Sequence, residues 1–169
     1  FQNKYGVSVT HAWGMTEMSP IGTMCSLKPE YRRLADDDRL DVQEKQGHAP
    51  FGVEVKIADD EGRELPWDGK TFGRLKVSGP AVAKAYYRVD SNILDEDGFF
   101  DTGDVATIDE AGYMRITDRS KDVIKSGGEW ISSIDLENLA VGHPAVAEAA
   151  VIGVYHPKWD ERPLLIVQL

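Results

Sequence analysis

The sequence predicts a mixed α/β and α+β fold, in which sheet-end loops and a small β-barrel or antiparallel sheet precede a smaller α+β unit. Residues 53–62 and 72–79 alternate apolar and polar side chains, as strands with one buried face do. An apparent helix from Ser133, followed by apolar runs, predicts the second unit. The 169 residues, 41% of them hydrophobic, are enough to bury a core.

The first part of the chain is expected to combine short strands with polar loops. Residues 5–13 are expected to form a strand that enters a turn at Gly14. Residues 28–46 are highly charged and predict a solvated loop with a short helix. Residues 81–87 are expected to form another short helix.

The second part predicts a hairpin, a helix and two more strands. Residues 104–109 and 113–117 alternate around a turn at 110–112. The helix has a serine cap, and its expected buried side is Ile134, Leu136, Leu139 and Ala140. The strands cover 148–155 and 163–169. Because the last run ends without a turn residue, we expect the chain to be a piece of a longer enzyme.

Charge and composition exclude several classes of partner. The formal net charge of −10 and the pI of about 4.8 argue against a general binder of nucleic acid or of anionic membranes. No apolar run approaches the ~20 residues of a transmembrane segment. Cys25 is the only cysteine, which fits a cytoplasmic location. The four histidines are scattered, so we expect no zinc site.

A first candidate site is the run Trp13-Gly14-Met15-Thr16-Glu17 at the end of the expected strand. Thr16 could donate a hydrogen bond to a phosphate, Glu17 could bind Mg²⁺, and Trp13 could stack on a base. The alternative is an ordinary helix start, in which Thr16 caps the helix and Glu17 complements its dipole. Spacing alone favours the alternative.

A second candidate site is Asp101-Thr102-Gly103-Asp104. A carboxylate at a strand entrance can accept both hydroxyls of a ribose, and a neighbouring glycine lets the sugar approach. The alternative is an ordinary turn, which the motif taken in isolation favours because Asp and Gly dominate turns.

The third candidate site is residues 117–132, where charged side chains precede a Gly127-Gly128 pair and Trp130. Lysine and arginine supply phosphate-binding donors. If the preceding strand continues, Arg119 and Lys121 share one face. The alternative is a charged edge strand protected from aggregation. A protective edge gives no reason for the glycines and the indole, so the pattern favours a functional segment.

The three motifs, in this order and at these separations, resemble those of the adenylate-forming superfamily, and specifically its acyl-CoA synthetases. The matching runs are WGMTEMSP, DTGD and DRSKDVIKSGGEWIS. The resemblance implies that ATP and Mg²⁺ convert a carboxylic acid to an acyl-adenylate and pyrophosphate. A thiol, usually that of coenzyme A, then displaces AMP.

The resemblance also implies a role for each matching residue. AMP would be contacted by Ala12, Trp13, Gly14 and Thr16, the metal by Glu17, and the ribose by Asp104 and Arg119. Lys121 would be the hinge about which a small C-terminal domain rotates, and Lys125 would lie near the phosphates. Gly127, Gly128 and Trp130 would meet coenzyme A. Thr16, Glu17 and Lys121 would thus be the catalytic residues.

Two departures from the common pattern, together with GGEWIS, resemble the fatty-acyl branch of the superfamily. Asp118 stands where many members have Gly, and Trp13 where many have Tyr. The family's phosphate loop would lie before Phe1 and its final catalytic lysine beyond Leu169. We therefore expect the isolated chain to be inactive in adenylation.

The resemblance implies a large-domain portion at 1–117, a hinge at 118–121 and the start of a small lid domain at 122–169. The favoured substrate is a fatty acid or a short thioether acid such as a methylthiopropionate, and a homodimer is possible. Two alternatives stay open. One is an adenylation domain that loads a carrier protein, and the other is a noncatalytic nucleotide-binding domain.

Overall fold

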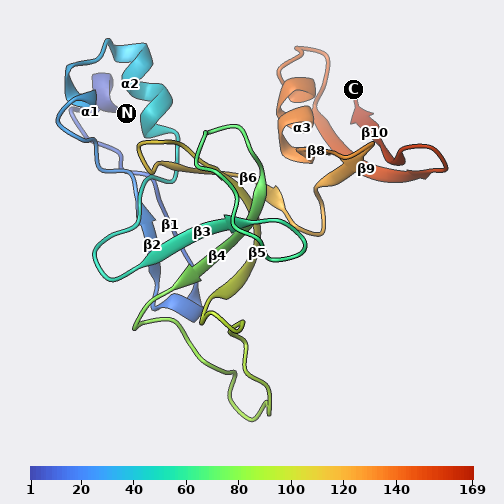
Figure 1. Ribbon diagram of the computed structural model, residues 1–169. Helices are drawn as coiled ribbons and strands as arrows, with labels where there is room; N and C mark the ends of the chain where they lie inside the picture. Colours follow the sequence, from blue (N-terminus) through green and yellow to red (C-terminus); the bar gives the residue numbers. More distant parts are fainter. The chain divides into compact units, whose positions relative to one another are not determined.

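The computed structural model describes residues 1–169, apart from the side chains at positions 2 and 3 (Figure 1). The chain divides into two compact units. The first comprises residues 1–102 and 106–116, and the second comprises residues 103–105 and 117–169. The mixed α/β content that the sequence predicts is confirmed, with strands more abundant than helices.

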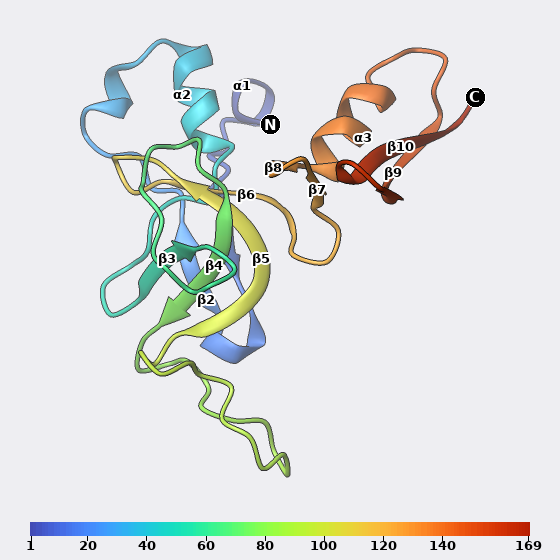
Figure 2. The ribbon, with the colours of Figure 1, turned by 45° about the vertical axis from the view of Figure 1, so that its right-hand side comes forward.

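The central sheet has four strands in the order β3-β4-β5-β6. Their bounds are Glu54–Ala58, Gly73–Ser78, Phe100–Ile108 and Met114–Arg119. β3 and β4 pair antiparallel, which confirms the two alternating strands. Among the described strands the sheet is not closed into the expected barrel, since its order runs from edge β3 to edge β6 without a pairing between them. β5 is long and strongly curved (Figure 2).

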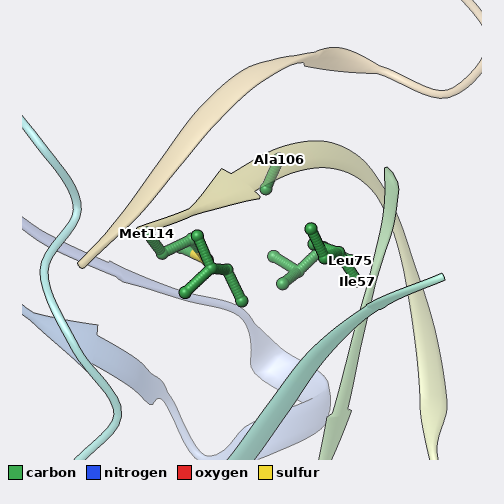
Figure 3. Close-up of a cluster of buried hydrophobic side chains, with 5 residues drawn as sticks. Ile57, Leu75, Ala106 and Met114 are labelled. Atoms are coloured by element: carbon green, nitrogen blue, oxygen red, sulfur yellow. The ribbon is translucent and has the colours of Figure 1, made fainter. Parts of the chain in front are cut away.

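The core of the first unit lies on one face of this sheet. Ile57, Leu75, Ala106, Ile108 and Met114 are fully buried and form one cluster (Figure 3). In β4 every second residue is buried, namely Gly73, Leu75 and Val77. The period-two pattern of the sequence therefore locates this core, because alternate residues of a strand point to opposite faces.

The remaining elements of the first unit are short. They are α1 Gln2–Tyr5, β1 Ala12–Gly14, the 3-10 helix Thr16–Met18, β2 Ile21–Met24, the 3-10 helix Tyr31–Arg33 and α2 Asp36–Gln43. β1 pairs antiparallel with β2. The short helix expected within 28–46 is confirmed as α2.

Two expected elements of this unit are wrong. The strand predicted over 5–13 begins only at Ala12, because Gly6 has a positive φ of 65° and Val7 and Val9 are exposed. The helix predicted over 81–87 is an irregular segment. Its Ala83 N–H donates to the carbonyl oxygen of Glu17 at 2.7 Å instead of to a helical neighbour. In residues 81–87 this contact with a distant part of the chain outweighs local preference.

The second unit contains a helix and a four-stranded sheet of order β8-β7-β10-β9. The bounds are β7 Ile124–Ser126, β8 Glu129–Ile131, α3 Ser133–Val141, β9 Glu148–His156 and β10 Asp160–Gln168. β9 and β10 form an antiparallel hairpin in unbroken register from Asp160↔His156 to Gln168↔Glu148. The helix and both strands predicted from the sequence are confirmed.

The buried side predicted for α3 is only partly right. Leu136 and Ala140 are half-buried, whereas Ile134 is exposed and Leu139 is 77% exposed. Helix α3 contacts the sheet partly through a polar bond, in which the Val151 N–H donates to Glu137 Oε1 at 2.9 Å. Among the helices of the described chain, none has the length and apolar character needed to cross a membrane.

Candidate functional site

The residues expected to contact AMP lie on β1 and the short helix that follows it. Ala12 borders a cavity of about 770 Å³ within the first unit, together with Val9, His11 and Leu40. Thr16 is exposed at the start of the 3-10 helix. The helix-capping alternative for Thr16 is wrong, because the cap residue is Met15 and it makes no side-chain cap bond.

The Trp13 side chain packs against the core of the first unit, which restricts stacking of its ring on a base. Its half-buried side chain packs against both apolar clusters of the first unit, including Met18. A Cβ at Gly22 would lie 2.3 Å from the Trp13 ring. The indole therefore packs against the core, and contact of this residue with AMP stays a prediction.

Close packing, independent of any ligand, explains why residue 14 is a glycine. A Cβ at this position would lie 1.7 Å from the Pro20 carbonyl oxygen, which belongs to the backbone and cannot swing away. The Ser19-Pro20 bond is cis, and this turn folds the chain back onto β1. Only glycine allows this approach.

We expect Gly14→Ala to lower the free energy of unfolding by about 1–3 kcal/mol, because the added methyl group overpacks the turn. Denaturant unfolding of the variant measures this loss. Gly142→Ala is the control, since φ there is −62° and the nearest backbone atom would be 3.3 Å away. An unchanged unfolding midpoint for Gly14→Ala would contradict the close approach.

Glu17, the expected metal ligand, is held by two contacts from residues 83–86. Its carbonyl oxygen accepts from the Ala83 N–H at 2.7 Å, and its Oε1 accepts from the Tyr86 hydroxyl at 2.8 Å. The bond to the Glu17 carboxylate raises the pKa of Tyr86, because the phenol must keep its proton to donate. The other carboxylate oxygen, Oε2, takes part in none of the hydrogen bonds of the described chain.

The surroundings of Glu17 fit a magnesium ion that is bound together with a nucleotide. No group of three or more His, Cys, Asp or Glu side chains that could hold a metal exists in the described residues. Mg²⁺ is usually bound by one or two carboxylates, with phosphate and water oxygens completing its shell. A single half-buried carboxylate with one uncommitted oxygen matches that requirement.

Asp104 and Arg119, the expected ribose ligands, lie side by side. Arg119 Nη1 is 3.0 Å from Asp104 Oδ1, and the two side chains are 60% and 8% exposed. Both belong to the second unit. The turn alternative for Asp101-Thr102-Gly103-Asp104 is wrong, because all four residues lie within β5. Gly103 has a φ of 75°, a conformation that glycine adopts without strain.

Lys121 lies in an exposed turn after β6. The strand ends at Arg119, so the expectation that Arg119 and Lys121 share a strand face is wrong. The turn forms because the Arg119 carbonyl accepts the N–H groups of Asp122 and Val123, at 3.0 and 2.9 Å. The Ser120 N–H donates a hydrogen bond to the Gly103 carbonyl oxygen at 2.9 Å. Lys121 makes no hydrogen bond or ion pair within the described chain.

Asp118 is a residue whose role the sequence did not reveal. Its side chain is buried, and Oδ2 accepts from the N–H and the hydroxyl of Ser133 at 2.7 and 2.8 Å. Beside it, the Ser132 hydroxyl donates to the Thr117 carbonyl at 2.7 Å and caps α3. We call these bonds between residues 117–118 and 132–133 the hinge clamp. The spacing Ser-x-x-Asp at 132–135 was the only sequence signal for it.

Gly127 and Gly128 form the two-residue turn between β7 and β8, in which Ser126 pairs with Glu129. Their φ angles of 61° and 87° suit the type I′ turn that matches strand twist. A Cβ on Gly127 would lie 2.6 Å from the Trp159 ring. The Lys125 ammonium lies 4.8 Å from the centre of the Trp130 ring, so the residue expected near the phosphates contacts one expected to meet coenzyme A.

The site residues thus fall into two groups. The first unit contains the residues expected to bind AMP and the metal, namely Ala12, Trp13, Gly14, Thr16 and Glu17. The second unit contains the others, namely Asp104, Arg119, Lys121, Lys125, Gly127, Gly128 and Trp130. Tyr86, Asp118 and Ser133 are additional residues at these places. The first had no sequence signal because its contact joins positions 69 residues apart.

Two family models match the chain. The AMP-binding enzyme model covers residues 1–87, and the model of the AMP-binding enzyme C-terminal domain covers residues 135–169. The first match contains the Trp13 to Glu17 run, and the second follows the glycine turn.

Curated relatives are named as CoA ligases. The chain is 58% identical to 3-methylmercaptopropionyl-CoA ligase of Ruegeria lacuscaerulensis, over 98% of this chain and 31% of the relative. It is 52% identical to the medium-chain-fatty-acid–CoA ligase of Ectopseudomonas oleovorans, over 98% of this chain and 31% of the relative. The chain therefore spans about a third of the length of these relatives.

A solved structure shares the architecture. The o-succinylbenzoate CoA synthetase of Bacillus subtilis, in complex with its acyl-adenylate intermediate, matches with a TM-score of 0.78 and 32% identity, over 98% of this chain and 32% of that one. The motifs, the two family models and this likeness agree. The chain belongs to the family of AMP-binding enzymes.

Proposed function

We propose that the full-length protein carrying this chain is an acyl-CoA synthetase. It uses ATP to convert a carboxylic acid to an acyl-adenylate and then transfers the acyl group to coenzyme A. The observation that carries the proposal is the Asp104–Arg119 pair, a buried carboxylate beside a largely exposed guanidinium on β5 and β6. Such a pair supplies both an acceptor for ribose hydroxyls and a fixed cation.

In this proposal the nucleotide contacts are those that the motifs imply. Asp104 and Arg119 bind the ribose, while the backbone of residues 12–14 and the Thr16 hydroxyl contact AMP. The cavity beside Ala12 supports this assignment. A magnesium ion on Glu17 would neutralise phosphate charge, which makes pyrophosphate a better leaving group. The half-buried Glu17 and its uncommitted Oε2 support that role.

The two half-reactions follow from the chemistry of the acid. A carboxylate oxygen attacks the α-phosphorus of ATP, and the bond to pyrophosphate breaks. The coenzyme A thiol, after losing its proton, attacks the acyl carbon, and the bond to AMP breaks. Lys121 serves as the pivot between the two arrangements, Lys125 lies near the phosphates, and Gly127, Gly128 and Trp130 meet coenzyme A.

The acid is a short thioether acid or a medium-chain fatty acid. The 58% and 52% identities to relatives named for such acids support both and favour the first. A cytoplasmic location and a homodimer belong to the same proposal, and the free, buried Cys25 is compatible with a reducing compartment.

The test is the full-length protein assayed with ATP, Mg²⁺, coenzyme A and a panel of acids from 3-methylthiopropionate to dodecanoate. We expect acyl-CoA and one pyrophosphate per turnover. We further expect Glu17→Gln to lower the adenylation rate by roughly 100-fold, since catalytic charge stabilisation is commonly worth that much. Glu30→Gln, an exposed carboxylate remote in sequence from the three motifs, is the control.

The assay separates the remaining functions. Pyrophosphate release with acyl transfer only to a carrier-protein thiol would identify an adenylation domain, and ATP binding without pyrophosphate release would identify a noncatalytic nucleotide-binding protein. Either result would overturn the proposal.

A further inference from the structure

We propose that Tyr86 is a positioning residue for the Glu17 carboxylate, which its phenol holds by one oxygen so that the other oxygen stays available to a cation. The inference rests on the proposed metal role of Glu17. It concerns a residue outside the three motifs, in an irregular segment to which the sequence assigned no chemistry.

The Tyr86 contact is specific in its geometry. The hydroxyl donates to Glu17 Oε1 at 2.8 Å, and it reaches across from a segment 69 residues away in the chain. A hydrogen bond to a charged acceptor is stronger than a neutral one and fixes the carboxylate rotamer. Two residues separate Glu17 from the end of β1, and Glu17 lies on a 3-10 helix of three residues, so its own element restrains the side chain weakly.

The segment that carries Tyr86 is itself fixed at Glu17. The Ala83 N–H donates to Glu17 O at 2.7 Å, and Val82 packs against the cluster that contains Met18. Further along, the Val89 N–H donates to Tyr86 O at 3.2 Å and the Ile93 N–H to Lys84 O at 3.1 Å. Backbone bonds therefore bring the tyrosine to the same carboxylate that its side chain contacts.

A neighbouring tyrosine provides the contrast. Tyr86 is 48% exposed and points its hydroxyl at Glu17, whereas Tyr87 is 84% exposed and its ring contacts only the Arg88 guanidinium, 5.0 Å away, among described interactions. A general need for aromatic surface in this segment would apply to both residues. Support of the Glu17 carboxylate applies to Tyr86 alone.

Partners that orient a metal-ligating side chain typically contribute tenfold or more to metal affinity. Removing the Tyr86 hydroxyl should therefore raise the concentration of Mg²⁺ needed for half-maximal adenylation by about tenfold. The rate at saturating Mg²⁺ should stay within about twofold of the wild type, since an excess of the ion restores occupancy.

The experiment uses Tyr86→Phe and the control Tyr87→Phe in the full-length protein. Adenylation is titrated with Mg²⁺. Binding is measured separately by the electron paramagnetic resonance of Mn²⁺ with a nonhydrolysable ATP analogue. We expect Tyr86→Phe to weaken Mn²⁺ binding by about tenfold and Tyr87→Phe to leave it unchanged. Equal Mn²⁺ affinity in Tyr86→Phe and wild type would overturn the inference.

Glu17→Gln separates this inference from the proposed function. If Glu17→Gln weakens Mn²⁺ binding and Tyr86→Phe does not, the metal role of Glu17 stands and the role of Tyr86 fails. If Glu17→Gln leaves Mn²⁺ binding unchanged, both fail. In the double variant, Tyr86→Phe should add no further loss, because a residue that acts through Glu17 loses its effect once that carboxylate is gone.

Discussion

Lys121→Pro in the full-length protein is expected to leave the rate of adenylation within about threefold of the wild type and to slow thioester formation by 100-fold or more. Proline fixes φ near −65° and restrains the preceding residue, so the chain can no longer change direction at this position. If the lid must turn between the half-reactions, only the second one stops. Pre-steady-state assays of pyrophosphate release and acyl-CoA formation measure the two rates separately.

The contacts of residues 118–121 support the proposed role of Lys121 as the pivot. Asp118 is bonded to Ser133, the Arg119 carbonyl accepts two N–H groups, and Ser120 donates to Gly103 O. Lys121 alone of these four residues makes no hydrogen bond or ion pair within the described chain. The backbone dihedral angles of Lys121 can therefore change without breaking a hydrogen bond made by Lys121.

The control is Lys121→Ala, which removes the charge and keeps the backbone free. We expect it to retain both half-reactions, which separates backbone freedom from charge. Equal survival of both half-reactions in Lys121→Pro would place the pivot elsewhere in the chain.

The fold could be predicted where the sequence repeats a local period. The alternating strands β3 and β4, the hairpin of β5 and β6, and helix α3 all follow from side-chain patterning. The errors lie where a distant contact decides. Residues 81–87 have helical composition, yet the Ala83 N–H donates to Glu17 O, and Leu139 fits an apolar stripe, yet it is exposed.

Some residues of the candidate site could likewise be predicted from the sequence, and others could not. Motif order was enough to single out Asp104 and Arg119, which the fold brings to 3.0 Å of each other. The residue types alone also suggested that Trp13 could stack on a base, but the ring packs against the core. The Tyr86–Glu17 and Asp118–Ser133 contacts could not be predicted from the sequence, because a hydrogen bond between residues far apart in the chain leaves no periodic pattern.

Asp118→Ala is expected to shift the ratio of the two half-reaction rates by 30-fold or more, with one rate rising and the other falling. The hinge clamp joins residues on the two sides of Lys121, at 2.7 and 2.8 Å to Ser133 and 2.7 Å from Ser132 to Thr117. A rotation at the proposed pivot Lys121 would move Ser133 away from Asp118. If the chain turns at Lys121 as proposed, the clamp stabilises only one of the two arrangements, and its loss favours the other.

The size of the shift follows from burial. Asp118 is 2% exposed, and removing its carboxylate leaves the Ser133 N–H and hydroxyl without their acceptor. Unsatisfied buried donors cost about 1–3 kcal/mol each, and 1.4 kcal/mol is a factor of ten in a population. Ser133→Ala keeps the backbone bond and should shift the ratio less, by roughly fivefold.

Ser126→Ala is the matched control for this series. Ser126 is a buried serine of the same unit, and its hydroxyl has no hydrogen-bond partner among the described residues, so its loss should leave the ratio unchanged. The graded order Asp118→Ala, Ser133→Ala, Ser126→Ala distinguishes a clamp from general destabilisation of the lid, which would slow both half-reactions together. Parallel losses in both rates for Asp118→Ala would show that the clamp persists through the turn, because a bond present in both arrangements cannot favour either.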